Sequence, residues 1–129
     1  MIGYTTLGTN DLERARAFYD AVLAPLGGRR TLTYERSQYW GGPGRGAMLG
    51  LTLPFDGDGQ SVGNGVMVAL TAETPEAIHA VHAAAMAAGA TCEGPPGDRG
   101  GGFYGAYFRD LDGNKLCVFK MGKDPPPTS

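Results

Sequence analysis

The chain has 129 residues, enough for one domain with a hydrophobic core and too few for two ordinary domains. Hydrophobic residues make up 42% and charged residues 19%, and the formal net charge is −2. These values are typical of a globular protein and leave no basic surface for nucleic acid or anionic lipid. No signal-like start is present, and no apolar run approaches the ~20 residues of a membrane span. We therefore expect a cytoplasmic protein with neither nucleic acid nor membrane as a partner.

Glycine and proline are unusually frequent, with 22 and 9 residues. They gather in the segments 41–46, 57–65 and 94–105 and in the proline-rich end of the chain. Such composition predicts tight turns and close backbone approaches, and a flexible C-terminal tail over 122–129. The two cysteines, Cys92 and Cys117, lack CxxC spacing, and we expect both to be free thiols.

The first half of the chain predicts a strand, a helix and three strands. The first strand covers residues 2–9, and Asn10 caps the helix, with Glu13 placed for a capping box. The apolar face of this helix follows helical spacing and comprises Leu12, Ala15, Tyr19, Val22 and Leu23. Pro25 and the pair Gly27–Gly28 end it. Strands are expected at 29–34, 37–41 and 47–53.

The second half repeats this order. A strand at 66–72 leads to a helix capped by Thr74, with Pro75 at its first position, and Gly89 ends the helix. Further strands are expected at 90–93, 103–109 and 115–121, and a hairpin turn at 110–114. The glycine-rich connection 94–102 is predicted to be a mobile lid.

The β-α-β-β-β order thus occurs twice, in modules of about 1–54 and 63–121. Each module is too small to bury its own sheet face, which predicts a single α+β domain over 1–121. We expect one curved, eight-stranded mixed sheet with both helices on the convex side and a pocket on the concave side. A ferredoxin-like domain is the alternative, but it does not account for three strands after each helix.

Three stretches make the comparison with a known family specific. They are IGYTTLGTNDLERARAFYDAVL, VMVALTAETPEAIHAVHAAAMAAGA and YFRDLDGNKLCVF. In their order and spacing they resemble the vicinal oxygen chelate family, which includes glyoxalase I, bleomycin-resistance proteins and extradiol dioxygenases. The resemblance extends from Met1 to about Met121 and implies the family's paired βαβββ fold.

The resemblance also implies a metal site on the concave sheet face, held in the family by His, His and Glu. The matching positions in this chain are Tyr4, Met67 and Cys117, and the fourth falls on Met48 or Gly50. Only Cys117 is an ordinary ligand for the divalent metals concerned. We therefore expect no metal and no other cofactor. A soft Cys/Met site for Cu(I) is the less favoured alternative to a simple apolar pocket lining.

Two candidate catalytic residues remain, Tyr4 as a hydrogen-bond donor or acid and Cys117 as a nucleophile. Cys117 would need a neighbouring cation, and Arg45, Arg99 and Arg109 are the candidates. Arg99 could also meet an anionic substrate, unless it is simply solvated. The expected ligand-binding set is Tyr4, Trp40, Met48, Met67, Arg99, Tyr104, Tyr107 and Cys117. The pair His79 and His82 should lie on the outer side of the sheet, away from this pocket.

Three functions are consistent with these residues. The favoured one is a metal-free module that binds a small, partly aromatic molecule, as the resemblance to bleomycin-resistance proteins implies. The second is a metal-dependent lyase or dioxygenase of the glyoxalase type, and the third is a metal-independent enzyme that uses Tyr4 or Cys117. A small-molecule ligand is the expected partner, and the resemblance also admits a homodimer.

Overall fold

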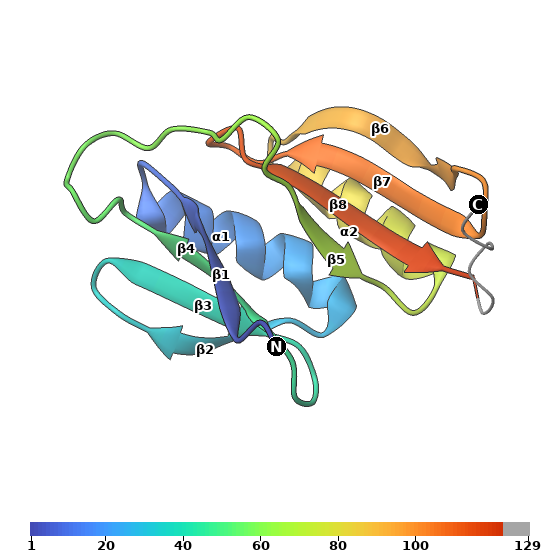
Figure 1. The fold of residues 1–129 in the computed structure, drawn as a ribbon, viewed down its shortest axis with the longest axis horizontal. Helices are drawn as coiled ribbons and strands as arrows, with labels where there is room; N and C mark the ends of the chain where they lie inside the picture. Colours follow the sequence, from blue (N-terminus) through green and yellow to red (C-terminus); the bar gives the residue numbers. More distant parts are fainter. Residues whose placement is uncertain (123–129) are drawn as a thin grey trace.

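The computed structural model describes residues 1–122, and each half of this segment forms a four-stranded sheet with one helix against it (Figure 1). The predicted flexible tail at 122–129 lies outside the described residues except for Gly122. The elements are β1 (Tyr4–Gly8), α1 (Leu12–Leu23), the short 3₁₀ helix η1 (Ala24–Leu26), β2 (Arg29–Thr33), β3 (Ser37–Gly41), β4 (Met48–Thr52), β5 (Val68–Thr71), α2 (Pro75–Ala87), β6 (Thr91–Asp98), β7 (Phe103–Arg109) and β8 (Lys115–Met121).

The two sheets have the same topology. Their strand orders are β1-β4-β3-β2 and β5-β8-β7-β6, with β1–β4 and β5–β8 parallel and the other pairs antiparallel. The predicted α+β class and βαβββ repeat are confirmed. The eight strands divide into two sheets, however, because no hydrogen bonds join β1 to β5. The modules meet instead through α1 and α2, which pack side by side (Figure 1).

The helix starts agree with sequence expectation in one module and differ by one residue in the other. Thr74 caps α2 by accepting a hydrogen bond from the Ala77 N–H, with Pro75 next to it, as predicted. In α1 the cap is Asp11, whose side chain accepts from the Arg14 N–H, so the prediction of Asn10 was wrong. Asn10 instead accepts from the Gln60 N–H at 2.7 Å, which ties the long loop after β4 to the start of the helix.

The hydrophobic core lies between the helices and the sheet faces that they cover. Every residue of the predicted α1 apolar face is buried, and so are Ile78, Val81 and Ala85 of α2. Trp40, Phe108, Leu116 and Val118 supply the sheet side of the core. None of the helices among residues 1–122 is long and apolar enough to cross a membrane.

The segment between α2 and β7 differs from the predicted lid. Residues up to Asp98 belong to β6 and pair with β7, with register irregularities near Gly94. The turn that follows contains Gly100, Gly101 and Gly102, all at positive φ, which explains their residue type. The glycine-rich stretch is therefore an edge strand and a tight hairpin, because Gly94 and Gly97 take part in the ladder.

Candidate functional site

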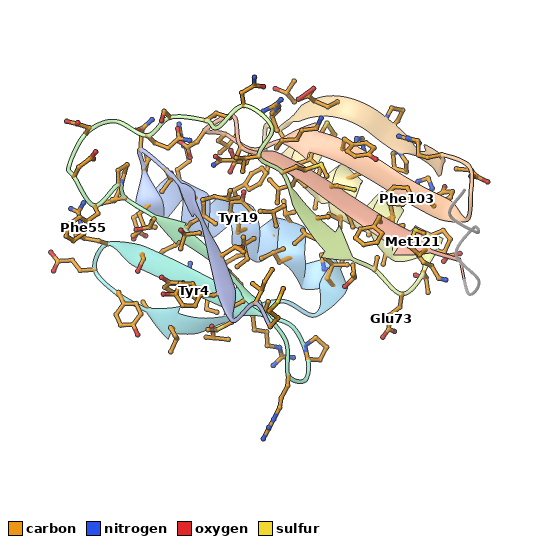
Figure 2. All side chains as sticks on the ribbon, in the orientation of Figure 1. Tyr4, Tyr19, Phe55, Glu73, Phe103 and Met121 are labelled. Carbon is orange, nitrogen blue, oxygen red and sulfur yellow. The ribbon has the colours of Figure 1, made fainter. Side chains whose placement is uncertain are left out.

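Each sheet has one face that no helix covers, and most of the predicted site residues lie on these two open faces. Side chains alternate between the two faces of a strand. Strand residues that are buried against a helix therefore alternate with residues that point to the open face. Tyr4, Met48 and Gly50 lie on the open face of the first sheet, and Tyr107 and Cys117 lie on that of the second. Figure 2 shows Tyr4 on the first sheet and Phe103 and Met121 at the far end of the second.

Three tyrosines form a cluster on the first open face. The Tyr39 ring meets the Tyr4 ring edge-on, with centroids 5.3 Å apart, and the Tyr34 ring in the same way at 6.1 Å. Tyr4 and Tyr34 remain 58% and 54% exposed. A Cβ at Gly50 would lie 2.5 Å from Tyr39 Cε2, so the absence of a side chain there lets the Tyr39 ring lie flat over β4.

Met48 lies beside this cluster, because it is the register partner of Tyr4 on the neighbouring strand. The Thr31 hydroxyl lies 3.2 Å from the Met48 sulfur and donates to it. The first open face therefore offers aromatic rings, a thioether and hydroxyl groups. Such a set suits contact with a flat, partly apolar molecule.

Cys117 lies at the centre of the second open face, where it pairs with Tyr107. It is only 1% exposed. Burial raises the pKa of its thiol, while the Tyr107 side chain, Arg99 and Lys115 act in the opposite direction without overcoming it. The thiol therefore stays protonated near neutral pH, which argues against the predicted role as a nucleophile.

Met67 lies at the rim of the second sheet. With the loop 62–66, Arg109 and Lys115 it lines a pocket of about 590 Å³. Met67 is 43% exposed. Arg109 in this pocket is engaged by Glu93 in an ion pair, whereas Lys115 has no carboxylate partner among residues 1–122.

Arg99 lies close to Tyr107, with its guanidinium carbon 5.6 Å from the ring centroid. Its Nη2 donates to the Pro95 carbonyl oxygen at 2.6 Å, so the side chain folds back over β6. The prediction that Arg99 contacts the site from the glycine-rich segment is compatible with this position. Arg99 holds this position, however, because it directly follows the paired strand β6, and not because it lies on a lid.

Trp40 and Tyr104, two of the predicted ligand contacts, lie on the helix-covered faces. Trp40 is 2% exposed, packs on Tyr19 and donates from Nε1 to Asp20 at 2.9 Å. The Tyr104 hydroxyl lies 2.7 Å from Nε2 of His79 on α2. Neither side chain belongs to an open face, because Trp40 is one residue from Tyr39 and Tyr104 is three from Tyr107, and odd spacings along a strand point to opposite faces.

The histidine pair lies away from the open faces, as expected. His79 is exposed, and His82 is half-buried with Nε2 3.3 Å from the sulfur of Cys92. Burial and the neighbouring His79 lower the pKa of His82. Within residues 1–122 no three His, Cys, Asp or Glu side chains are grouped as metal ligands.

The residues at the positions where the family would place a metal do not suit one. Tyr4 and Met48 lie on the first sheet, whereas Cys117 lies on the second, and the two sheets share no hydrogen-bonded edge. The set contains no imidazole and no carboxylate, and its one thiol has a raised pKa although metal binding needs the thiolate. This donor set does not fit a divalent metal ion.

A larger hollow, of about 740 Å³, lies elsewhere. It is lined by residues of both modules, from η1, the loop 42–47 and the end of β5. Trp40 is the only predicted site residue in it. Size alone would favour this hollow as a site, but aromatic and cationic side chains converge on the open faces.

Sequence reasoning missed Tyr34, Lys115 and Phe119 of the open faces, and the expected ligand-binding set also left out Tyr39 and Phe103. Two of them were accessible from strand alternation, because Lys115 and Phe119 lie two residues on either side of Cys117 and share its face. Tyr34 follows the last residue of β2 and reaches Tyr39 across the ladder. No pattern in the sequence indicates that contact.

Comparison with known proteins agrees with this geometry. Residues 1–118 match the model of the Glyoxalase/Bleomycin resistance protein/Dioxygenase superfamily. A crystal structure of a glyoxalase/bleomycin resistance protein from Albidiferax ferrireducens T118 is 38% identical, with a TM-score of 0.85 over 94% of this chain and 98% of that one. No curated protein sequence matches the chain significantly.

Two more distant structures share the fold. A glyoxalase/bleomycin resistance protein/dioxygenase family enzyme from Burkholderia phytofirmans PsJN is 18% identical, with a TM-score of 0.72 over 92% of this chain and 97% of that one. A glyoxalase-related enzyme from Fulvimarina pelagi is 19% identical, with a TM-score of 0.74 over 100% of this chain and 97% of that one. At these identities the likeness concerns the fold alone.

Proposed function

Because the chain belongs to the Glyoxalase/Bleomycin resistance protein/Dioxygenase superfamily, we propose that it binds a small, partly aromatic molecule on the open faces of its sheets. The observation that carries the proposal is the tyrosine cluster on the first face, where Tyr4 and Tyr34 are more than half exposed and both meet Tyr39 edge-on. Exposed rings gathered on one face of a globular protein are typical of binding surfaces.

The alternatives from the same family fit the residues less well. A metal-dependent lyase or dioxygenase needs ligands that polarise substrate oxygens through the ion, and Tyr4, Met48, Met67 and Cys117 do not form such a set. A metal-independent enzyme needs an activated group, and Cys117 is buried with a raised thiol pKa. Binding without chemistry requires only the shape and the rings, which the open faces supply.

Titration with N-phenyl-1-naphthylamine tests the proposal, because this neutral aromatic amine fluoresces strongly in apolar surroundings. We expect saturable binding to the wild-type protein and a loss of up to about tenfold in affinity for Tyr39→Ala, which removes the ring shared by both aromatic pairs. Phe55→Ala is the matched control, since Phe55 is an exposed ring outside both open faces. Absence of saturable binding, or an equal loss for the two variants, would overturn the proposal.

We also propose that the protein acts as a homodimer. Within residues 1–122, β1 and β5 each leave one strand edge unpaired, and such edges are commonly covered in native proteins. Apolar side chains at or next to these edges are exposed, namely Ile2, Val66 and Met67. Light scattering on the eluting protein is expected to give twice the mass of the chain, and Ile2→Glu and Val66→Glu should reduce it to the monomer. A monomeric wild type would refute this.

A cytoplasmic location is our remaining proposal about the protein's setting. Cys92 and Cys117 are both free, which suits a reducing compartment. Fractionation of cells that express the protein is expected to place it with cytoplasmic markers, and recovery with membranes or in the medium would contradict this.

A further inference from the structure

Two cations lie beside the same ring on the second open face. The Arg99 guanidinium carbon and the Lys115 ammonium nitrogen are each 5.6 Å from the centroid of the Tyr107 ring. Within residues 1–122 neither cation forms an ion pair with a carboxylate. Glu93, the acidic residue on the neighbouring strand, is already paired with Arg109. Each cation is therefore held against the ring without an ion pair from this part of the chain, and a bound anion would supply that partner.

The position of Arg99 depends on two glycines of β6. A Cβ at Gly94 would lie 3.0 Å from Arg99 Nη2, and a Cβ at Gly97 would lie 3.0 Å from Nη1. The hydrogen bond from Nη2 to the Pro95 carbonyl, at 2.6 Å, fixes the guanidinium against the strand. An exposed arginine usually extends into solvent, but this one lies flat on the sheet because the two residues beneath it lack side chains.

The same open face becomes aromatic away from these cations. The rings of Phe103 and Phe119 stack in parallel, with centroids 5.2 Å apart and planes 2° from parallel. A Cβ at Gly105 would lie 2.7 Å from Phe103 Cε1, so the Phe103 ring covers the glycine next to Tyr107 on this face. Tyr107 and Phe103 are four residues apart on one strand, roughly 13 Å at the usual rise. That span matches a small ligand with an apolar body and one charged end.

We propose that the open face of the second sheet binds an anionic molecule with an aromatic or apolar body, whose carboxylate, sulfonate or phosphate pairs with Arg99 and Lys115 beside the Tyr107 ring. The apolar part lies over Phe103 and Phe119, and Tyr107 separates the two regions. This inference rests on the proposed binding function and adds the charge of the ligand to it. A single ligand type then accounts for Gly94 and Gly97, for two cations that have no ion pair within residues 1–122, and for the aromatic stack.

A matched pair of fluorescent probes tests the inference. 8-Anilino-1-naphthalenesulfonate is the sulfonated relative of N-phenyl-1-naphthylamine, so the two share an aromatic body and differ in the anion. We expect the sulfonate to bind the wild-type protein about tenfold more tightly than the neutral amine. Arg99→Gln and Lys115→Gln should each remove most of that advantage, because each takes one positive charge from the proposed anion site. Arg45→Gln, at an exposed arginine in the loop 42–47, is the control and should behave as the wild type.

A measurement on the wild type alone guards against misfolded variants. Raising the salt concentration from about 0.05 M to about 0.5 M should weaken binding of the sulfonate and leave binding of the amine unchanged, because only the sulfonate is attracted by charge. Competition with 2-naphthoate and 2-naphthyl phosphate then identifies the preferred anion. The preferred one is the competitor that displaces the sulfonate at the lower concentration.

The outcomes separate the two proposals. If the amine binds and the sulfonate binds no more tightly, is insensitive to salt and is unaffected by both Gln variants, the anion inference fails and the proposed binding function stands. If neither probe binds, both fail. Failure of both naphthalene competitors to displace the sulfonate would also overturn the anion site.

Discussion

The Tyr19 hydroxyl on α1 donates a hydrogen bond to Oδ2 of Asp110, 2.5 Å away in the β7–β8 hairpin. Both side chains are buried, and together they join the first module to the second. Oδ1 of Asp110 also accepts from the backbone N–H groups of Asp112 and Asn114. Burial, and next the charge of Asp110, raise the pKa of Tyr19 well above its ordinary value. The phenol therefore remains a neutral hydrogen-bond donor near neutral pH.

Removing this hydroxyl should destabilise the protein. Tyr19→Phe leaves the buried Asp110 carboxylate with one donor fewer, and we expect a loss of about 1–3 kcal/mol in the free energy of unfolding. Urea denaturation followed by the fluorescence of Trp40, the only tryptophan of the chain, measures it. Tyr34→Phe is the control, because Tyr34 is exposed, and it should change stability by less than about 0.5 kcal/mol. Equal effects in the two variants would contradict the role of the Tyr19 hydroxyl.

Asp20 should give the protein an acid-sensitive contribution to stability. Burial acts to raise the pKa of Asp20, but hydrogen bonds from Arg30 and Trp40 outweigh it, and the pKa is lowered from its ordinary value. Because the pKa of Asp20 is lower in the folded than in the unfolded protein, its ionised carboxylate stabilises the fold above about pH 4. This stabilisation is lost as the pH falls through the pKa of Asp20 in the folded state. Asp20→Asn should therefore be less stable than the wild type at pH 7, and the difference should shrink near pH 3. A difference that is independent of pH would refute this.

The two cysteines should differ in reactivity. Cys92 is exposed, whereas Cys117 is buried and the pKa of its thiol is raised. With 5,5′-dithiobis(2-nitrobenzoate) we expect one thiol to react promptly in the native protein and the second only after denaturation. Cys92→Ser should abolish the prompt reaction, and Cys117→Ser should leave it unchanged. Prompt reaction at Cys117 would contradict this prediction and support the role of Cys117 as a nucleophile.

The purified protein should carry little metal. The residues Tyr4, Met48, Met67 and Cys117 lack imidazole and carboxylate, so elemental analysis after expression in metal-supplemented medium should give less than about 0.1 equivalent of any transition metal per chain. Near-stoichiometric metal that is lost in Cys117→Ala or Met67→Ala would show that these side chains do form a metal centre.

Most of the fold was predictable because local signals agreed. Thr74 followed by Pro75, the helical spacing from Leu12 to Leu23 and the hairpin at 110–114 each depend on residues close in sequence, and all are confirmed. The helix cap at Asp11 and the length of β6 were missed. At the cap, Asn10 and Asp11 have similar propensities, and the contact of Asn10 with the distant Gln60 accompanies the choice of Asp11. In β6, the glycines and prolines after Glu93 are typical of a turn, but pairing with β7 extends the strand to Asp98.

The site was harder to predict than the fold. The resemblance placed Tyr4, Met48 and Cys117 on the open faces. For the other strand residues, alternation says which of them share a face, but the register is needed to say which face that is. Trp40 and Tyr104 were therefore included in the expected ligand-binding set, although they point to the side opposite Tyr39 and Tyr107. The anchoring of Arg99 over Gly94 and Gly97 depends on how a strand and its turn fold back together, and no local pattern encodes it.

Amide chemical-shift mapping with N-phenyl-1-naphthylamine tests the central claim most directly, because it locates the ligand without any substitution. Binding on the open faces predicts that the largest shifts fall on residues such as Tyr39, Gly50, Gly105 and Cys117. The claim is contradicted if the largest shifts instead follow the 740 Å³ hollow between the modules, at Gly42–Ala47 and Thr71–Thr74.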